Sequence, residues 1–305
     1  MFDVATLGGV LPALVTPLTE DGVVDTPAVD RLVEHVLAGG VSGLVPLGST
    51  GETASLDETA RRRMLGAVLK AARGRVPVIC GVAQSHLSAA QAEVDAAAGL
   101  GADAALVAPP FYYPIDQATV LAFYRSLAAS STIPILLYNI PQFTKIVAEP
   151  ATVAALAREG AIKGIKDSSR DFEYFELVCG ATRDLPAFRI FTGSDSMLLA
   201  SLAMGGAGTI CGAANVAPAW VVRIYEDVKR GDWSAARDHQ DQLVDLIMRL
   251  RGGVFPAAIK AALELQGVCS AWPARPIAPL DTRAKAALGE RLASWGLLAT
   301  APQPR

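Results

Sequence analysis

The stretch AIKGIKDSS, residues 161–169, joins a short apolar-leaning strand to a lysine at its carboxyl end. Lys163 and Lys166 are three residues apart, so a strand directs them to opposite faces. Only Lys166 lies at the end of the strand. Because burial disfavours the charged form of lysine, an ammonium group at this place requires an explanation.

Runs of similar composition recur along the chain, each followed by a turn-forming cluster and an Ala-rich amphipathic segment. The eight predicted strands span residues 10–16, 42–48, 76–81, 102–109, 133–139, 161–167, 188–193 and 206–212. Eight strand-helix units within roughly 230 residues are typical of a (β/α)8 TIM barrel. Near-continuous apolar strands also suit a parallel sheet covered by helices. The structural alternative is a doubly wound open sheet.

Further helical patterns follow the part that a barrel needs, at residues 233–251, 256–267 and 282–296, separated by Gly and Pro breaks. We therefore expect a barrel over residues 1–230 that carries the active site, and a C-terminal helical extension over residues 231–305. Within the barrel, Ser55 and Glu58 have the spacing of a capping box and predict a helix start.

Composition narrows the class of ligand. The chain has 305 residues, 51% of them hydrophobic, and a net charge of -3 from 27 basic and 30 acidic residues. This balance favours a small-molecule ligand over nucleic acid or an anionic membrane surface. The four cysteines are isolated, which predicts a reducing compartment and no metal site. With no signal-peptide pattern and no run of eighteen apolar residues, a cytoplasmic location is expected.

The active site of a TIM barrel lies at the carboxyl ends of its strands, which is where Lys166 falls. A lysine enclosed by apolar surface has a lowered pKa, and its neutral amine can condense with a ketone to give a Schiff base. The alternative is an ion pair between Lys166 and a carboxylate such as the adjacent Asp167.

Three other strand ends carry residues suited to chemistry. GSTGE at 48–52 offers consecutive backbone N–H groups that could hold a carboxylate, although such stretches are often plain turns. YNIP at 138–141 places a phenol where it could transfer protons, or where it merely packs. PPFYYP at 109–114 contains two tyrosines between prolines and, by itself, favours packing.

Six motifs together resemble one known superfamily. LVPLGSTGE, VAPPFYYP, ILLYNIP, GIKDSS, FTGSD and GAGTICGAANVAP occur in the order and spacing of the dihydrodipicolinate synthase and N-acetylneuraminate lyase superfamily, class I pyruvate-dependent aldolases. The resemblance covers essentially the whole chain. It implies that Lys166 forms an imine with pyruvate, or with the pyruvate portion of a longer 2-oxo acid, without a metal or another cofactor.

The resemblance also implies roles for other residues. Tyr138 matches the general acid and base, and Thr50 would connect it to Tyr112, which in related dimers comes from the neighbouring subunit. The expected partners are therefore pyruvate, an aldehyde and further copies of the chain, as a dimer or tetramer. The amides of Ser49 and Thr50 would bind the pyruvate carboxylate, and Gly51 belongs to the same turn. The rest of the pocket is expected to involve Phe143, Ser168, Gly193, Asp195 and Ile210.

A departure from the superfamily pattern narrows the range of candidate substrates. Dihydrodipicolinate synthases have an arginine for aspartate semialdehyde two residues after the YN(I/V)P turn, and Phe143 stands there. N-acetylneuraminate lyases usually carry KQT where this chain has KDSS. We therefore expect an aldolase that cleaves or forms a 2-keto-3-deoxy sugar acid or a 4-hydroxy-2-oxo acid. Alternatives are 4-hydroxy-tetrahydrodipicolinate synthase, N-acetylneuraminate lyase, a dehydratase that uses the same imine, and a non-enzymatic oxo-acid sensor.

Overall fold

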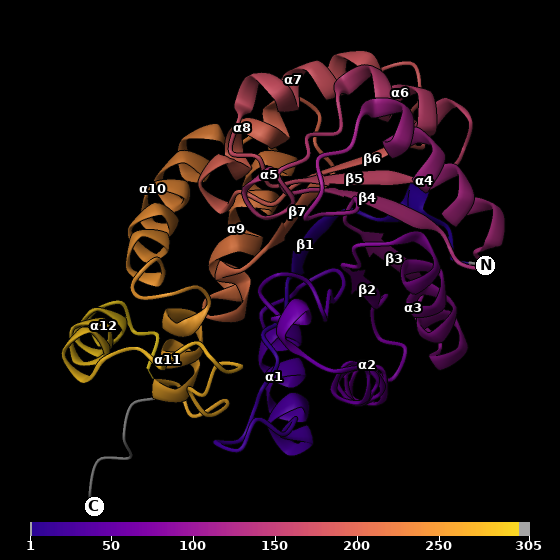
Figure 1. The fold of residues 1–305 in the computed structure, drawn as a ribbon. Coiled ribbons are helices and arrows are strands. Elements are labelled where there is room, and N and C mark those ends of the chain that lie inside the picture. The colour runs from indigo at the N-terminus through magenta and orange to yellow at the C-terminus, as the bar shows by residue number, and fades with distance from the viewer. Residues whose placement is uncertain (1, 299–305) are drawn as a thin grey trace, which may run out of the picture.

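A curled, parallel sheet forms the centre of the computed structural model, which describes residues 2–298 (Figure 1). Its strand order is β1-β7-β6-β5-β4-β3-β2. The strands are β1 (Gly9–Pro12), β2 (Ile79–Val82), β3 (Ala104–Val107), β4 (Ile135–Asn139), β5 (Gly164–Asp167), β6 (Arg189–Thr192) and β7 (Gly208–Cys211). These strands lie inside the predicted ones, except that β1 begins one residue earlier and β2 ends one residue later than predicted.

The predicted strand at 42–48 is wrong as a regular strand, but its segment closes the barrel. It lies between β1 and β2, the two edges of the sheet, through isolated parallel bridges of Ala13 with Val45 and of Leu44 with Val78. Proline has no N–H to donate, so Pro46 interrupts the ladder, and Leu47 turns away at a φ of 62°. The fold is the expected TIM barrel, and closure excludes the open sheet.

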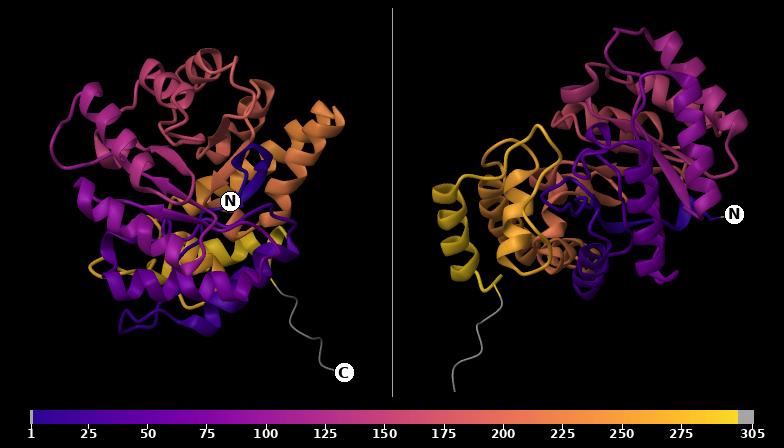
Figure 2. Two further views of the ribbon diagram at one scale, coloured as in Figure 1. Left: turned by 90° about the vertical axis from the view of Figure 1, so that its right-hand side faces the viewer. Right: turned by 60° about the horizontal axis from the view of Figure 1, so that its bottom comes forward.

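Helices surround the sheet in the order that a TIM barrel requires (Figures 1 and 2). They are α1 (Thr26–Ala38), α2 (Glu58–Ala72), α3 (Leu87–Leu100), α4 (Gln117–Ser130), α6 (Pro150–Arg158), α7 (Phe172–Ala181), α8 (Leu198–Ala203) and α9 (Pro218–Arg230). Short elements occupy the loops: α5 (Pro141–Thr144) and the 3-10 turns η1 (Val4–Thr6), η2 (Thr53–Ser55), η3 (Asp195–Met197) and η4 (Ala213–Asn215).

The predicted capping box of Ser55 and Glu58 is wrong. The N-cap of α2 is Asp57, whose side chain accepts the Ala60 N–H at 2.7 Å, while Ser55 ends η2. Aspartate is as good an N-cap as serine, so Asp57, which directly precedes the first residue of α2, takes the N-cap position.

Two separate apolar cores hold the barrel together. The larger lies between the sheet and the surrounding helices. The smaller fills the barrel interior with inward-facing side chains such as Leu11, Leu136 and Phe191, and Val4 and Leu7 join it from the turn before β1. Tyr138 and Ile210 also belong to the interior, which places the site directly above this core.

The C-terminal helices α10 (Trp233–Leu250), α11 (Ala257–Leu265) and α12 (Thr282–Ser294) gather on one side of the barrel (Figures 1 and 2). Their bounds agree closely with the predicted helical patterns. Helix α10 packs along α9, so the extension continues the helical layer, and the boundary at residue 231 stays a prediction. The last residues of the predicted extension, 299–305, lie outside the described residues.

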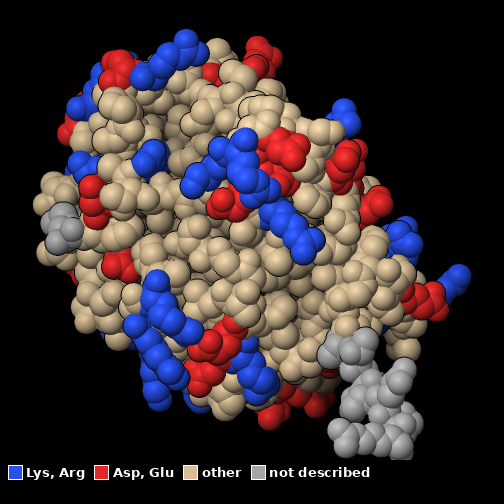
Figure 3. Space-filling view, turned by 180° about the vertical axis from the view of Figure 1, so that it is seen from behind, with Lys and Arg blue, Asp and Glu red and all other residues tan. Residues whose placement is uncertain are grey.

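Charged side chains of both signs are interspersed on the face seen from behind, with no broad field of one sign (Figure 3). Over the described surface, several charged side chains form exposed ion pairs, such as Arg75 with Glu34 and Arg125 with Glu159. Exposed pairs of this kind contribute roughly 0–1 kcal/mol each. Within residues 2–298, no helix has both the length and the apolar character to cross a membrane.

Candidate active site

Lys166 lies inside the barrel near the carboxyl end of β5. It pairs in register with Tyr138 of β4 and Phe191 of β6, which both belong to the barrel interior. Neighbours in register in a parallel sheet share a face, so Lys166 also points inward. Its side chain is only 4% exposed, and Nζ lies 4.2 Å from the centroid of the Tyr138 ring.

Asp167 does not neutralise Lys166. Successive residues of a strand face opposite sides, and the buried Asp167 accepts hydrogen bonds from Asn139 Nδ2 at 2.8 Å and from Ser169 Oγ at 2.9 Å. Burial raises the pKa of Asp167, an effect that these bonds oppose. Among residues 2–298, no carboxylate oxygen lies within 4.0 Å of Lys166 Nζ. The structure therefore does not contain the alternative ion pair between Lys166 and Asp167 or another described carboxylate.

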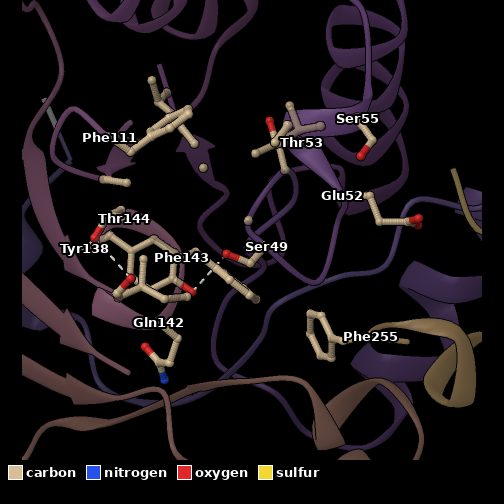
Figure 4. Close-up of a pocket in the computed structure, with 18 of the residues that line it drawn as sticks. Ser49, Glu52, Thr53, Ser55, Phe111, Tyr138, Gln142, Phe143, Thr144 and Phe255 are labelled. Carbon is tan, nitrogen blue, oxygen red and sulfur yellow. Dashed lines mark hydrogen bonds between the residues drawn. The ribbon is translucent and has the colours of Figure 1, made fainter. Parts of the chain in front are cut away.

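The hydroxyl of Tyr138 lies 3.3 Å from Ser49 Oγ, which connects β4 to the turn after the bridging segment 42–48 (Figure 4). The superfamily resemblance implies that Thr50 connects Tyr138 to Tyr112 of a neighbouring subunit, and that link stays a prediction. Ser49 precedes Thr50 in a tight turn, where neighbouring side chains take different directions. Thr50 is 5% exposed and lines the same cavity as Lys166, which is compatible with a catalytic role. That role stays a prediction.

The same turn presents two free amides. Within the described part of the chain, neither the Ser49 nor the Thr50 N–H donates to a protein acceptor, whereas the Gly51 N–H donates to Gly48 O at 3.0 Å. A Cβ on Gly51 would lie 2.9 Å from Leu47 N, so glycine lets the turn fold tightly upon itself. Two adjacent free N–H groups suit a carboxylate. Direct binding by Gly51 stays a prediction.

A cavity of about 500 Å³, which we call the lysine pocket, opens above Lys166. It contains most of the predicted site residues: Ser49, Thr50, Tyr138, Phe143, Lys166, Ser168, Gly193, Asp195 and Ile210. Ile210 is fully buried and forms part of the pocket wall. A Cβ on Gly193 would lie 2.8 Å from Lys166 Cε and 2.0 Å from Ser168 Oγ, so this position has room only for glycine.

An adjoining cavity of about 430 Å³, the aromatic pocket, is lined by Phe111, Phe143 and Phe255 together with Ser49 and Tyr138 (Figure 4). Phe143 is 58% exposed on α5 and borders both cavities. The phenyl ring therefore stands where the lysine pocket meets a second apolar space.

Asp195 lies at the start of η3 with its carboxylate turned to backbone. Its Oδ2 accepts the Ala213 N–H at 2.9 Å, and Gln240 donates to its carbonyl oxygen at 3.1 Å. Burial raises the pKa of Asp195, which the Ala213 N–H and the charge of Lys166 oppose. The remaining carboxylate oxygen leaves room for a substrate contact, and this role stays a prediction.

Tyr112 lies apart from the other predicted catalytic residues. It is 85% exposed, has a φ of 85°, and borders neither the lysine pocket nor the aromatic pocket of its own chain. Its ring meets that of Tyr113 edge to face, with centroids 5.0 Å apart. The predicted role of Tyr112 in the site of a neighbouring subunit stays a prediction.

Several pocket residues escaped the sequence analysis. Arg170, Arg251 and Phe255 all border the lysine pocket. Arg170 follows β5 closely, so the strand-end rule could have found it. Arg251 caps the end of α10 and Phe255 lies in the turn between α10 and α11, and no local signal relates them to a barrel loop.

Residues in the left-handed region cluster around the site. Leu47, Glu52 and Arg170, which border the two pockets, have φ between 59° and 64° although none is glycine. Such conformations are costly for side chains with a Cβ and gather at functional sites. Among residues 2–298, no three His, Cys, Asp or Glu side chains lie together as metal ligands would. The prediction that no cofactor is needed stays untested.

The fold and the pocket define a TIM-barrel enzyme whose active site lies at the carboxyl ends of the strands. The chain belongs to the dihydrodipicolinate synthetase family, whose profile matches residues 6–294, and is a pyruvate-dependent lyase of that family. The superfamily resemblance of the sequence is thereby confirmed.

Two curated relatives and one solved structure illustrate the similarity. The chain is 38% identical to a 4-hydroxy-tetrahydrodipicolinate synthase of Phenylobacterium zucineum, over 95% of this chain and 98% of the relative. It is 38% identical to an uncharacterized DapA-like lyase of Halobacterium salinarum, over 96% and 95% of the two chains. The chain also resembles the solved structure of YagE, with a TM-score of 0.92 and 29% sequence identity, over 96% of this chain and 99% of YagE. YagE is a prophage protein of Escherichia coli K12 that belongs to the dihydrodipicolinic acid synthase family, and its structure contains pyruvate.

Proposed function

We propose that this chain is a class I aldolase whose Lys166 forms an imine with pyruvate, or with the pyruvate portion of a longer 2-oxo acid. Its substrate is a 2-keto-3-deoxy sugar acid or a 4-hydroxy-2-oxo acid, cleaved or formed at the bond next to the pyruvate methyl carbon. One observation carries the proposal: the amine of Lys166 is buried, has no carboxylate partner within the described residues, and faces a cavity beside the Tyr138 phenol.

The geometry supports a simple sequence of steps. The Lys166 amine attacks the ketone carbon, and the carbonyl oxygen leaves as water after proton transfer through Tyr138. The free amides of Ser49 and Thr50 hold the adjacent carboxylate, so the ketone lies over Nζ. Tyr138 then takes the proton of the 4-hydroxyl group while the protonated imine accepts the electron pair of the breaking carbon-carbon bond, which leaves an enamine and releases an aldehyde. Protonation of the enamine and hydrolysis return pyruvate and Lys166.

4-Hydroxy-tetrahydrodipicolinate synthase is the second candidate. The relative in Phenylobacterium zucineum that carries this name favours it. Phe143 opposes it, since a phenyl ring cannot pair with a carboxylate. Its neighbours do not compensate: Lys145 Nζ donates to Gln142 O at 2.8 Å, and the Gln142 side chain donates to Ser168 O. Losing a charge-assisted contact of about 1.5–3 kcal/mol weakens aspartate semialdehyde binding by about tenfold or more.

Assembly is part of the proposal. The exposed, strained Tyr112 supports a homo-oligomer, dimer or tetramer, in which this tyrosine completes the site of a neighbouring subunit. The four cysteines are free and buried, which supports a reducing, cytoplasmic setting.

Reductive trapping tests the proposal. Wild type and Lys166→Ala are incubated with pyruvate and borohydride, and the intact mass of each is measured. The wild type alone is expected to gain a reduced pyruvyl adduct. Absence of the adduct from the wild type overturns the proposal. Once the adduct is found, pyruvate release from sugar acids and 4-hydroxy-2-oxo acids separates an aldolase from a dehydratase, which instead releases water and keeps the carbon chain intact.

A further inference from the structure

Two arginines stand at the outer part of the lysine pocket. Arg170 follows β5 in the loop before α7, and Arg251 is the C-cap residue of α10, so they reach the cavity from the barrel and from the C-terminal extension. Both are exposed, whereas Lys166 is buried at the inner end. A pocket of about 500 Å³ has space for a substrate that extends well beyond pyruvate.

Neither guanidinium group is used in an ion pair. Within residues 2–298, no carboxylate oxygen lies within 4.0 Å of Arg170 or Arg251, and the recorded contact of Arg251 is with Met248 Sδ at 3.5 Å. Asp195, an acid that lines the pocket, accepts the Ala213 N–H; the charge of Arg251 works against the burial that raises the pKa of Asp195, but the two groups make no contact within 4.0 Å. Guanidinium groups bind carboxylates through two parallel hydrogen bonds, so this pair is suited to an anionic group of the ligand.

The position of Arg170 is fixed by its loop. Its φ is 64°, in the region where glycine is the residue of least strain. On either side the backbone is held: the Ser169 N–H donates to Asp167 Oδ1 at 3.1 Å, and the Asp171 N–H donates to Ser169 Oγ at 3.1 Å. Asp171 also caps α7 by accepting the Tyr174 N–H at 3.1 Å. A long charged side chain is thus kept at a strained place on a rigid loop that borders the pocket, which points to a use in binding.

We propose that Arg170 and Arg251 bind a second carboxylate at the end of the substrate remote from the imine, which makes the substrate a hydroxylated 2-oxo dicarboxylate. This inference rests on the proposed function, because it takes Lys166 as the inner anchor. It also explains how the chain dispenses with a charged residue at Phe143: the anionic end is bound from the β5 loop and α10 instead of from α5.

Matched pairs of unreactive analogues test the proposal without knowledge of the natural substrate. 2-Oxoglutarate and 2-oxopentanoate differ only by a carboxylate in place of a methyl group, as do 2-oxoadipate and 2-oxohexanoate at greater length. The concentration of each that gives half-maximal borohydride trapping on Lys166 is measured for wild type, Arg170→Gln, Arg251→Gln and the double variant. Arg249→Gln is the control, because Arg249 is exposed on the same helix but does not border the lysine pocket.

In at least one pair, the dicarboxylate is expected to be trapped at about tenfold lower concentration by the wild type, and each pocket variant should reduce this preference several-fold. The values for the methyl-ended acids, and all values for Arg249→Gln, should stay unchanged. If pyruvate itself is not trapped by the wild type, the proposed function fails. If pyruvate is trapped but the wild type shows no preference in either pair, or the pocket variants retain it, the proposed function stands and the second carboxylate site is overturned.

Discussion

Lys260 Nζ lies 2.5 Å from Glu52 Oε1, and both side chains are almost completely buried. Lys260 also donates to Trp272 O at 2.7 Å, while Glu52 Oε2 accepts the Ala274 N–H at 2.6 Å. Burial lowers the pKa of Lys260, and the charge of Glu52 opposes this effect. The pair therefore ties the turn that ends at Glu52, and carries the free amides, to α11 and the segment after it.

Replacing Lys260 by Met should destabilise the protein by about 3–5 kcal/mol, because the Glu52 carboxylate would remain buried without its partner. Adding Glu52→Gln should recover part of the loss, since the buried charge is then removed. The free energy of unfolding from urea titrations of both variants measures these changes. A loss below about 1 kcal/mol in Lys260→Met would contradict a structural role for the pair.

Gly193→Ala should lower the yield of the borohydride adduct, because its Cβ would overlap Ser168 Oγ and press on Lys166 Cε. A displacement of about 1 Å at a reacting group can cost roughly a hundredfold in rate. Gly180→Ala is the matched control: nothing lies within 4 Å of a Cβ on this helical glycine. That control should trap pyruvate normally and gain about 0.5–1 kcal/mol in stability. Equal trapping by both variants would rule out the steric argument.

Phe143→Arg should raise kcat/KM for condensation of pyruvate with aspartate semialdehyde by about tenfold or more, because a guanidinium would be available to the carboxylate. Phe143→Leu provides the comparison, since it shortens the side chain without adding charge. Product formation is followed for both variants. An equal gain in kcat/KM in both variants would mean that the bulk of the Phe143 side chain, and not the absence of a charge, limits the reaction of aspartate semialdehyde.

A mixture of Tyr112→Phe and Lys166→Ala subunits should regain activity that each variant lacks. In a mixed dimer, one site combines an intact Lys166 with an intact Tyr112 from the other subunit. The activity of separately purified variants is compared before and after they are dissociated and reassociated together. If reassociation restores nothing while wild type treated in the same way recovers, Tyr112 does not act across an interface.

Asp167 and Asp116 should influence stability with opposite dependence on pH. Burial raises the pKa of Asp167 above 3.8, so the folded state holds its proton more tightly, and its contribution to stability decreases as pH rises through that window. Hydrogen bonds from Thr119 lower the pKa of Asp116, so its contribution is lost as pH falls below 3.8. Relative to wild type, Asp167→Asn should therefore become more stable with rising pH, and Asp116→Asn less stable. Urea titrations between acid and neutral pH distinguish the two slopes.

The barrel could be predicted because its strands are buried on both faces and so appear as continuous apolar runs between turn residues. The segment 42–48 has the same composition, but Pro46 and the left-handed Leu47 prevent a regular ladder, and composition does not report backbone hydrogen bonds. Lys166 and Tyr138 were predictable from their places at strand ends. Whether Ser49 or Thr50 contacts the Tyr138 hydroxyl depends on the directions of their side chains within one turn. The spacing of residues in the sequence does not determine those directions.

Residues that come from distant parts of the chain were beyond prediction. Arg251 and Lys260 lie in the C-terminal helices, and their patterns are those of ordinary amphipathic segments. Only the folded chain brings Arg251 to the lysine pocket and Lys260 to Glu52. Long-range pairing of this kind has no local sequence signal.

Phe143 and Arg170 lie on exposed loop segments, outside the strand ladder and outside both apolar cores. Substituting either residue removes no ladder hydrogen bond and little buried apolar area, so such substitutions cost little stability. Lys166, Tyr138 and Gly193 have no such freedom, because they are fixed by the sheet and by close contacts. A barrel built in this way can acquire a new substrate through a few loop substitutions while its covalent chemistry stays the same, which is a short evolutionary route between enzymes of one family.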